Sequence, residues 1–219
     1  MRRALLPLLL LLAACTERRS AVIARCQADM DDLRDRISHA ASGLPRRSAP
    51  TARASLTPPP AYARSGADSN AAFITLEEAV GGKIAPFDLQ LPSDLLSCLR
   101  WTGTAPMADA ALAERDPEFA AKFARAKATK YLVVICSQLA DVQVSATTYM
   151  GGDLVVTAVV IELTTGAVKA IAQVAALPPE EVIANAESAR RTIIALIWKD
   201  ARNRLGSVLD QATGGSFQL

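Results

Sequence analysis

Hydrophobic side chains recur at helical spacing in two long segments of the chain. Steps of three or four residues line one face of an α-helix. The first such stripe comprises Ile23, Cys26, Met30, Leu33, Ile37, Ala40 and Leu44. The second comprises Val182, Ala186, Ala189, Ile193, Ile197, Ala201, Leu205 and Val208. We predict an amphipathic helix in each segment. The first ends at Gly43 and Pro45, and the second begins at Glu180-Glu181 and covers a sheet.

The first helix leaves two arrangements open. Its stripe is barely three heptads long, so a coiled coil and a helix packed on its own domain are both compatible with it.

Between these helices the hydrophobic pattern becomes that of β-strands. Residues 130–136 (KYLVVIC) form an unbroken apolar run, typical of a strand buried on both faces. Residues 141–149 alternate between apolar and polar, which indicates a strand with one wet face. Close turns at Gly151-Gly152-Asp153 and Thr165-Gly166 delimit two more strands, 154–163 and 167–176. The pattern predicts an antiparallel meander of three to four strands.

Three shorter helices are expected ahead of the meander. Breakers delimit the first two, Asn70 to Val80 and Ser93 to Arg100. The third follows Asp116 and Pro117, which suit its N-terminus, and ends near Lys127. The predicted fold class is therefore α+β, an antiparallel meander covered on one face by helices.

The first fifteen residues have the organisation of an export signal. Arg2 and Arg3 precede an apolar stretch that ends at Cys15, and the charged residues Glu17-Arg18-Arg19 come just after it. The stretch is too short to cross a membrane, which needs about 20 apolar residues, but it has the length of a signal-peptide core.

Leu12-Ala13-Ala14-Cys15 resembles the lipobox of bacterial lipoproteins. The resemblance implies cleavage before Cys15 and attachment of acyl chains to that cysteine, which would anchor the protein in the membrane. Because Thr16 rather than an aspartate follows, it implies the periplasmic face of the outer membrane in a double-membraned bacterium. The other interpretation is an ordinary secretory signal cleaved near Ala13 or Ala14, with Cys15 left as a free thiol.

Proline and arginine dominate the segment after the first helix. Residues 45–66 hold five prolines, four arginines and no acid, so we expect an extended, semi-rigid tether. Gly214-Gly215 near the other end is expected to release a flexible tail. The predicted organisation is a signal peptide (1–14), a lipidated cysteine with its helix (15–44), a linker (45–67), an α+β periplasmic domain (68–213) and a tail (214–219).

Removal of residues 1–14 changes the charge and the cysteine count. The mature chain has 22 basic side chains, the total of 24 less Arg2 and Arg3, and 22 acidic ones. This balance argues against nucleic acid as a partner. Three thiols remain, Cys26, Cys98 and Cys136. Because Cys26 lies across the linker, the predicted disulfide is Cys98–Cys136; the alternative is three buried, reduced thiols.

Few residues offer catalytic chemistry. His39 is the only histidine and lies in the first helix, where we expect it to be a solvated surface residue. A Ser-His-Asp arrangement and a histidine zinc site inside the domain are therefore excluded. The chain has no phosphate-binding glycine motif and no C-x-x-C, so no metal and no small-molecule cofactor is expected. Acid pairs remain, at Glu77-Glu78 and Glu180-Glu181.

A second resemblance concerns residues 126–136 and 150–174. These segments are similar to small α+β domains of periplasmic lipoproteins, such as activators of penicillin-binding proteins and the curli secretion lipoprotein. The shared feature is an acid-x-x-Thr-Gly turn, here Glu162 to Gly166. The resemblance implies an interaction domain.

The predicted function is binding of an envelope protein or assembly by a lipid-anchored, non-catalytic domain, through an exposed sheet edge or the wet strand. The alternative is a peptidoglycan hydrolase or cell-wall-binding module that uses carboxylates. A third hypothesis gives the protein a purely structural role at the membrane.

Overall fold

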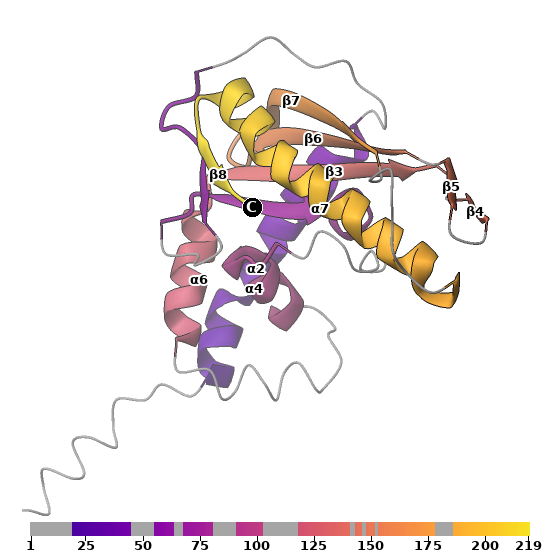
Figure 1. Ribbon diagram of the computed structural model, residues 1–219. Coiled ribbons are helices and arrows are strands. Elements are labelled where there is room, and N and C mark those ends of the chain that lie inside the picture. The colour runs from indigo at the N-terminus through magenta and orange to yellow at the C-terminus, as the bar shows by residue number, and fades with distance from the viewer. Residues whose placement is uncertain are drawn as a thin grey trace, which may run out of the picture.

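A four-stranded sheet organises the fold (Figure 1). The computed structural model describes residues 19–44, 55–63, 68–80, 91–102, 118–140, 143–145, 148–151, 153–177 and 186–219. The strand order is β2 (Ala71–Thr75), β3 (Tyr131–Leu139), β6 (Leu154–Glu162) and β7 (Ala167–Ala176). β2 runs parallel to β3, whereas β3, β6 and β7 pair antiparallel. The α+β class and the antiparallel meander are confirmed.

Helices cover both faces of this sheet. α7 (Ala186–Thr213) packs on one face, and α2 (Arg19–Ser42), α4 (Asp94–Thr102) and α6 (Phe119–Ala128) pack on the other. Alternate residues of β3 belong to the two cores, Val133 to the α7 side and Leu132 to the other. The prediction of helices on one face is therefore wrong. The unbroken apolar run of β3 already required two covered faces.

α2 packs on its own domain, the second of the two arrangements left open above. Met30, Leu33 and Ile37 are buried in one core with Leu132 and Val134 of the sheet. The spacing of its apolar residues therefore serves an intramolecular interface.

The prediction of one helix from Asn70 to Val80 is wrong. The segment forms β2 followed by the short helix α3 (Leu76–Ala79). β2 is buried beside β3, with Ala71 paired to Tyr131 and Thr75 to Ile135. Thr75 caps α3. Burial of β2 in the sheet outweighs the helix-favouring alanines.

The prediction of one strand over residues 141–149 is also wrong. β4 (Gln143–Ser145) and β5 (Thr148–Gly151) pair with each other in a separate two-stranded sheet. β3 instead continues to Leu139, which pairs with Leu154 at the start of β6. The alternating pattern thus falls in the segment between the long strands β3 and β6, which contains the separate β4–β5 pair.

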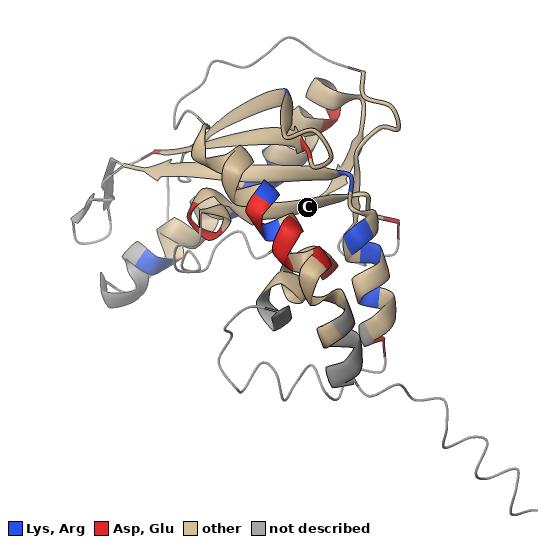
Figure 2. Ribbon diagram, turned by 180° about the vertical axis from the view of Figure 1, so that it is seen from behind, with Lys and Arg blue, Asp and Glu red and all other residues tan. Residues whose placement is uncertain are grey.

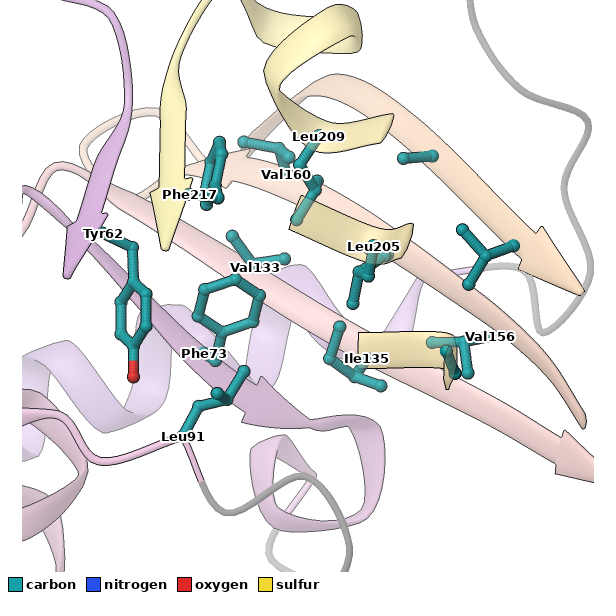
Figure 3. Packing of buried hydrophobic residues seen from close by; sticks show 14 of the residues in the cluster. Tyr62, Phe73, Leu91, Val133, Ile135, Val156, Val160, Leu205, Leu209 and Phe217 are labelled. Carbon is teal, nitrogen blue, oxygen red and sulfur yellow. The ribbon is translucent and has the colours of Figure 1, made fainter. Parts of the chain in front are cut away.

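The C-terminal residues are not a flexible tail. β8 (Ser216–Gln218) pairs in parallel with β1 (Ala61–Ala63), inside the predicted linker. Phe217 is buried and packs edge-to-face on Phe73, whose ring also packs edge-to-face with Tyr62 (Figure 3). Residues 55–63 are thus part of the fold rather than of a tether. Residues 45–54 and 64–67 lie outside the described residues.

The shorter helices α4 and α6 agree with the prediction. α4 covers most of the expected segment, and α6 ends at Ala128, beside Lys127. The expected N-terminal residues Asp116 and Pro117, and the expected start of α7 at Glu180-Glu181, lie outside the described residues.

Candidate functional site: the first helix and the open sheet edge

The predicted lipidation site, Cys15, lies outside the described residues, as does the predicted signal peptide 1–14. What the structure describes is α2, which begins at Arg19, four positions after Cys15. None of the helices in the described ranges is long and apolar enough to cross a membrane.

Polar contacts to three other parts of the fold reinforce the packing of α2. The Arg34 guanidinium donates from Nη2 to the carbonyl oxygen of Leu99 in α4, at 2.8 Å. The Arg36 guanidinium donates from Nη1 to the carbonyl oxygen of Leu163, at 3.2 Å, and Asp29 forms an ion pair with Lys127 of α6. Figure 2 shows the acidic and basic residues along α2 and the basic residues of α6 beside it. These contacts fix the part of α2 between Asp29 and Arg36.

The cysteines are arranged differently from the predicted pairing. The structure lacks the Cys98–Cys136 disulfide: Cys26, Cys98 and Cys136 are all buried, reduced thiols, the alternative stated above. Cys98 lies in the core between the helices, which it shares with Cys26 of α2. Cys136 belongs to β3, opposite Thr157 of β6. The spacing of the cysteines along the sequence does not show how α2 packs on α4, so it could not predict that Cys26 and Cys98 share a core.

Cys98 is chemically unreactive at neutral pH. Burial raises the pKa of its thiol to about 12, and the charge of Asp94 and the nearby Cys26 act in the same direction, against Lys122 and Arg125. A nucleophilic or redox-active cysteine needs a lowered pKa. Cys98 therefore serves packing.

Of the two described candidate acids, Glu78 has a structural role. The Glu78 carboxylate accepts hydrogen bonds from the backbone N–H and the hydroxyl of Thr75, both at 3.2 Å, in a capping box. Glu77 beside it is exposed, and Glu180 and Glu181 lie outside the described residues. His39 is exposed on α2, as predicted. Within the described ranges, no three His, Cys, Asp or Glu side chains group so as to bind a metal ion.

The Glu162-to-Gly166 motif builds the turn of the β6–β7 hairpin. Gly166 has a φ of +67°, and its N–H donates to the Glu162 carbonyl oxygen at 2.8 Å. The Glu162 carboxylate accepts the Thr165 hydroxyl at 2.9 Å and pairs with Lys169 at 3.0 Å. Lys169 and Thr165 hold the pKa of Glu162 below its usual value. The motif is thus explained by the turn that it forms.

Among the described residues, each edge strand of the sheet, β2 and β7, pairs on one side only, and β7 is the longer of the two. β7 pairs with β6 only. A bulge in the β6–β7 pairing falls at Lys169, because Val160 pairs with Ala170 and Ile161 with Val168. At the other end, Arg204 Nη1 donates to the Ala175 carbonyl oxygen at 3.1 Å. We call residues 170–174, between these two protected ends, the open edge.

Exposed apolar side chains flank the open edge. Val168 on one side is 46% exposed, and Leu177 on the other is 66% exposed. An unpaired strand edge offers backbone N–H and C=O groups to another chain, and apolar side chains beside it add contact area. The main sheet therefore has an unpaired edge at β7, whereas the predicted wet strand lies outside that sheet.

Comparison with known protein families, characterised proteins and solved structures finds no match to this chain. Its function is therefore inferred from its own residues.

Proposed function

We propose that this chain is a lipoprotein anchored through acyl chains on Cys15 to the periplasmic face of the outer membrane, and that its α+β domain binds an envelope protein without catalysis. The observation that carries the proposal is Leu12-Ala13-Ala14-Cys15, placed after a short apolar core and four positions ahead of the start of α2. Each buried CH₂ group of an acyl chain contributes about 0.8 kcal/mol to membrane binding, so several chains hold a protein firmly.

The open edge of β7 supports the binding part of the proposal. An extended segment of an envelope protein would continue the sheet there, taking its hydrogen bonds from the backbone of residues 170–174. Val168 and Leu177 would contact apolar side chains of that segment. Low charge along the strand favours such pairing, because its one charged residue, Lys169, is already bound to Glu162.

Lipidation is tested on the full chain expressed in a bacterium. Metabolic labelling with an alkyne fatty acid, followed by mass spectrometry of the mature N-terminus, should find a diacylglyceryl-modified, N-acylated Cys15. The Cys15→Ser variant should remain unlabelled and uncleaved. A mature chain that starts at Ala14, or that carries an unmodified Cys15, would overturn the proposal.

Partner binding is tested with a photo-crosslinking amino acid at Val168 in cells. We expect one reproducible envelope protein in the adduct. The matched control carries the crosslinker at Gln211, exposed on α7, and should give no such adduct. An adduct only with a second copy of this chain, or measurable turnover of peptidoglycan fragments by the purified protein, would contradict the proposal.

A further inference from the structure

The chain between the proposed anchor and the folded domain is very short. Only residues 16–18 separate Cys15 from Arg19, the first residue of α2. An extended chain spans at most about 3.6 Å per residue, so these four steps reach about 14 Å. From Cys26 onward α2 gives no additional length, because Cys26, Met30 and Ile37 on it are 9%, 0% and 2% exposed in the domain core.

If α2 and the proline-rich linker acted as spacers, the domain would lie much farther from the anchor. If α2 stood free, its 24 residues would add about 36 Å at 1.5 Å each. A proline-rich linker over residues 45–67 would add about 70 Å at ~3.1 Å per residue. The domain would then stand roughly 100 Å from the anchor. Since α2 packs on the sheet, and β1 within residues 45–67 pairs with β8, neither segment separates the anchor from the domain.

The two ends of α2 lie at opposite sides of the molecule. In Figure 1 the helix begins at the end of the α2, α4 and α6 layer that lies away from the sheet. Its other end reaches the β6–β7 hairpin, where Arg36 binds the Leu163 carbonyl oxygen and Ala40 faces Gly166. Arg36 and Ala40 follow Arg19 by 17 and 21 residues, so the hairpin is about 26–32 Å along the helix axis from the start of α2.

We infer that the domain lies directly against the lipid surface, with the starting end of α2 toward the headgroups and the β6–β7 hairpin away from them. The inference rests on the proposed lipidation of Cys15. Arg18 and Arg19, which outnumber Glu17 next to the anchor, suit anionic headgroups. The orientation leaves the Val168 end of the open edge, beside the hairpin, accessible from the periplasm.

The experiment measures the proximity of two dyes to the membrane. The lipidated full chain is placed in phosphatidylethanolamine–phosphatidylglycerol vesicles that carry nitroxide on their headgroups. A dye is attached at Ala24→Cys, near the start of α2, or at Thr164→Cys in the hairpin; both positions are exposed. The parent chain controls for labelling of the buried native thiols. Quenching should be severalfold stronger at position 24 than at position 164.

Two insertions provide the matched control. A Gly/Ser segment of about 20 residues has an end-to-end distance of about 25 Å. Inserted between Glu17 and Arg18, it should weaken quenching at position 24. Inserted between Ala49 and Pro50, it should leave that quenching unchanged. Equal quenching at the two dye positions, or equal effects of the two insertions, would overturn the inference.

Flotation of the same vesicles separates failure of anchoring from failure of orientation. A wild-type chain that does not float with the vesicles overturns the proposed anchoring, and this inference with it. A chain that floats with them but shows no stronger quenching at position 24 overturns the inference alone.

Discussion

Cys98 couples stability to pH through its burial. Its thiol has a pKa of about 12 in the folded protein, against an ordinary value of 9.0. Below pH 9 the folded and unfolded chains both keep the proton. Between these values the unfolded chain loses it and the folded chain does not, so the free energy of unfolding falls as the pH rises, by about 1.4 kcal/mol per unit.

The Cys98→Ala variant isolates this effect. We expect the free energy of unfolding of the wild type, relative to the variant, to be about 1.4 kcal/mol lower at pH 10 than at pH 8. Urea denaturation at both pH values measures it. Lysines and the other thiols titrate in both proteins, so their effects cancel. Parallel pH dependence in the two proteins would show that the Cys98 thiol is not buried as described.

Gly166 occupies a backbone conformation that other residues rarely adopt. At its φ of +67°, an added Cβ meets nothing closer than Ala40 Cβ at 4.0 Å, so conformation rather than space limits substitution. We predict that Gly166→Ala lowers the free energy of unfolding by about 1–2 kcal/mol. Gly43→Ala, in open space without a positive φ, should leave it unchanged or raise it by up to about 1 kcal/mol. Urea denaturation of both variants decides; equal effects would contradict the prediction.

Elements whose signals are local could be predicted from the sequence. β7 was placed correctly because Thr165-Gly166 and Pro178 delimit an apolar run, and α7 because its stripe is long and regular. β2 and β8 could not be placed, because their structure depends on distant partners. β2 is a strand through its pairing with β3, some sixty positions later, and β8 through its pairing with β1.

β8 is only three residues long, so side-chain packing stabilises it more than backbone pairing does. Phe217 is 5% exposed and stacks edge-to-face on Phe73, with ring centroids 5.9 Å apart. We predict that Phe217→Ala lowers the free energy of unfolding by about 3–5 kcal/mol. The exposed neighbour Gln218, changed to Ala, should alter it by no more than about 0.5 kcal/mol. Thermal or urea denaturation measures both. A flexible tail would make the two variants indistinguishable from the wild type.

The candidate site was also predictable only in part, because it too depends on contacts between residues far apart in the sequence. The open sheet edge was anticipated in kind, because an antiparallel meander must end in two edge strands. The strand order β2-β3-β6-β7 decides which strands lie at the edges, and Arg204 limits how far the β7 edge is open; neither is visible in the sequence pattern. Likewise, the proximity of Cys26 and Cys98 arises from the packing of α2 on α4.

At the scale of the whole molecule, two hydrophobic cores share one sheet, so removing either helix layer exposes a hydrophobic face of that sheet. On the α2 side, the α2 residues Met30, Leu33 and Ile37 cover this face. At about 1.5–3 kcal/mol for each buried side chain, these three contribute about 5–9 kcal/mol. A domain of this size has a total stability of about 5–15 kcal/mol. α2 is therefore necessary for folding.

A chain starting at residue 45 should accordingly fail to fold, although it contains the whole sheet. We expect no cooperative transition in urea for residues 45–219, and a cooperative one for residues 15–219 carrying Cys15→Ser. A peptide of residues 19–44, added in excess, should restore the transition in a concentration-dependent way, because it binds only the folded state. An Ile37→Ala peptide should do so less effectively. If residues 45–219 unfolded at the same urea concentration as the longer chain, α2 would be dispensable, and the domain could stand away from the membrane.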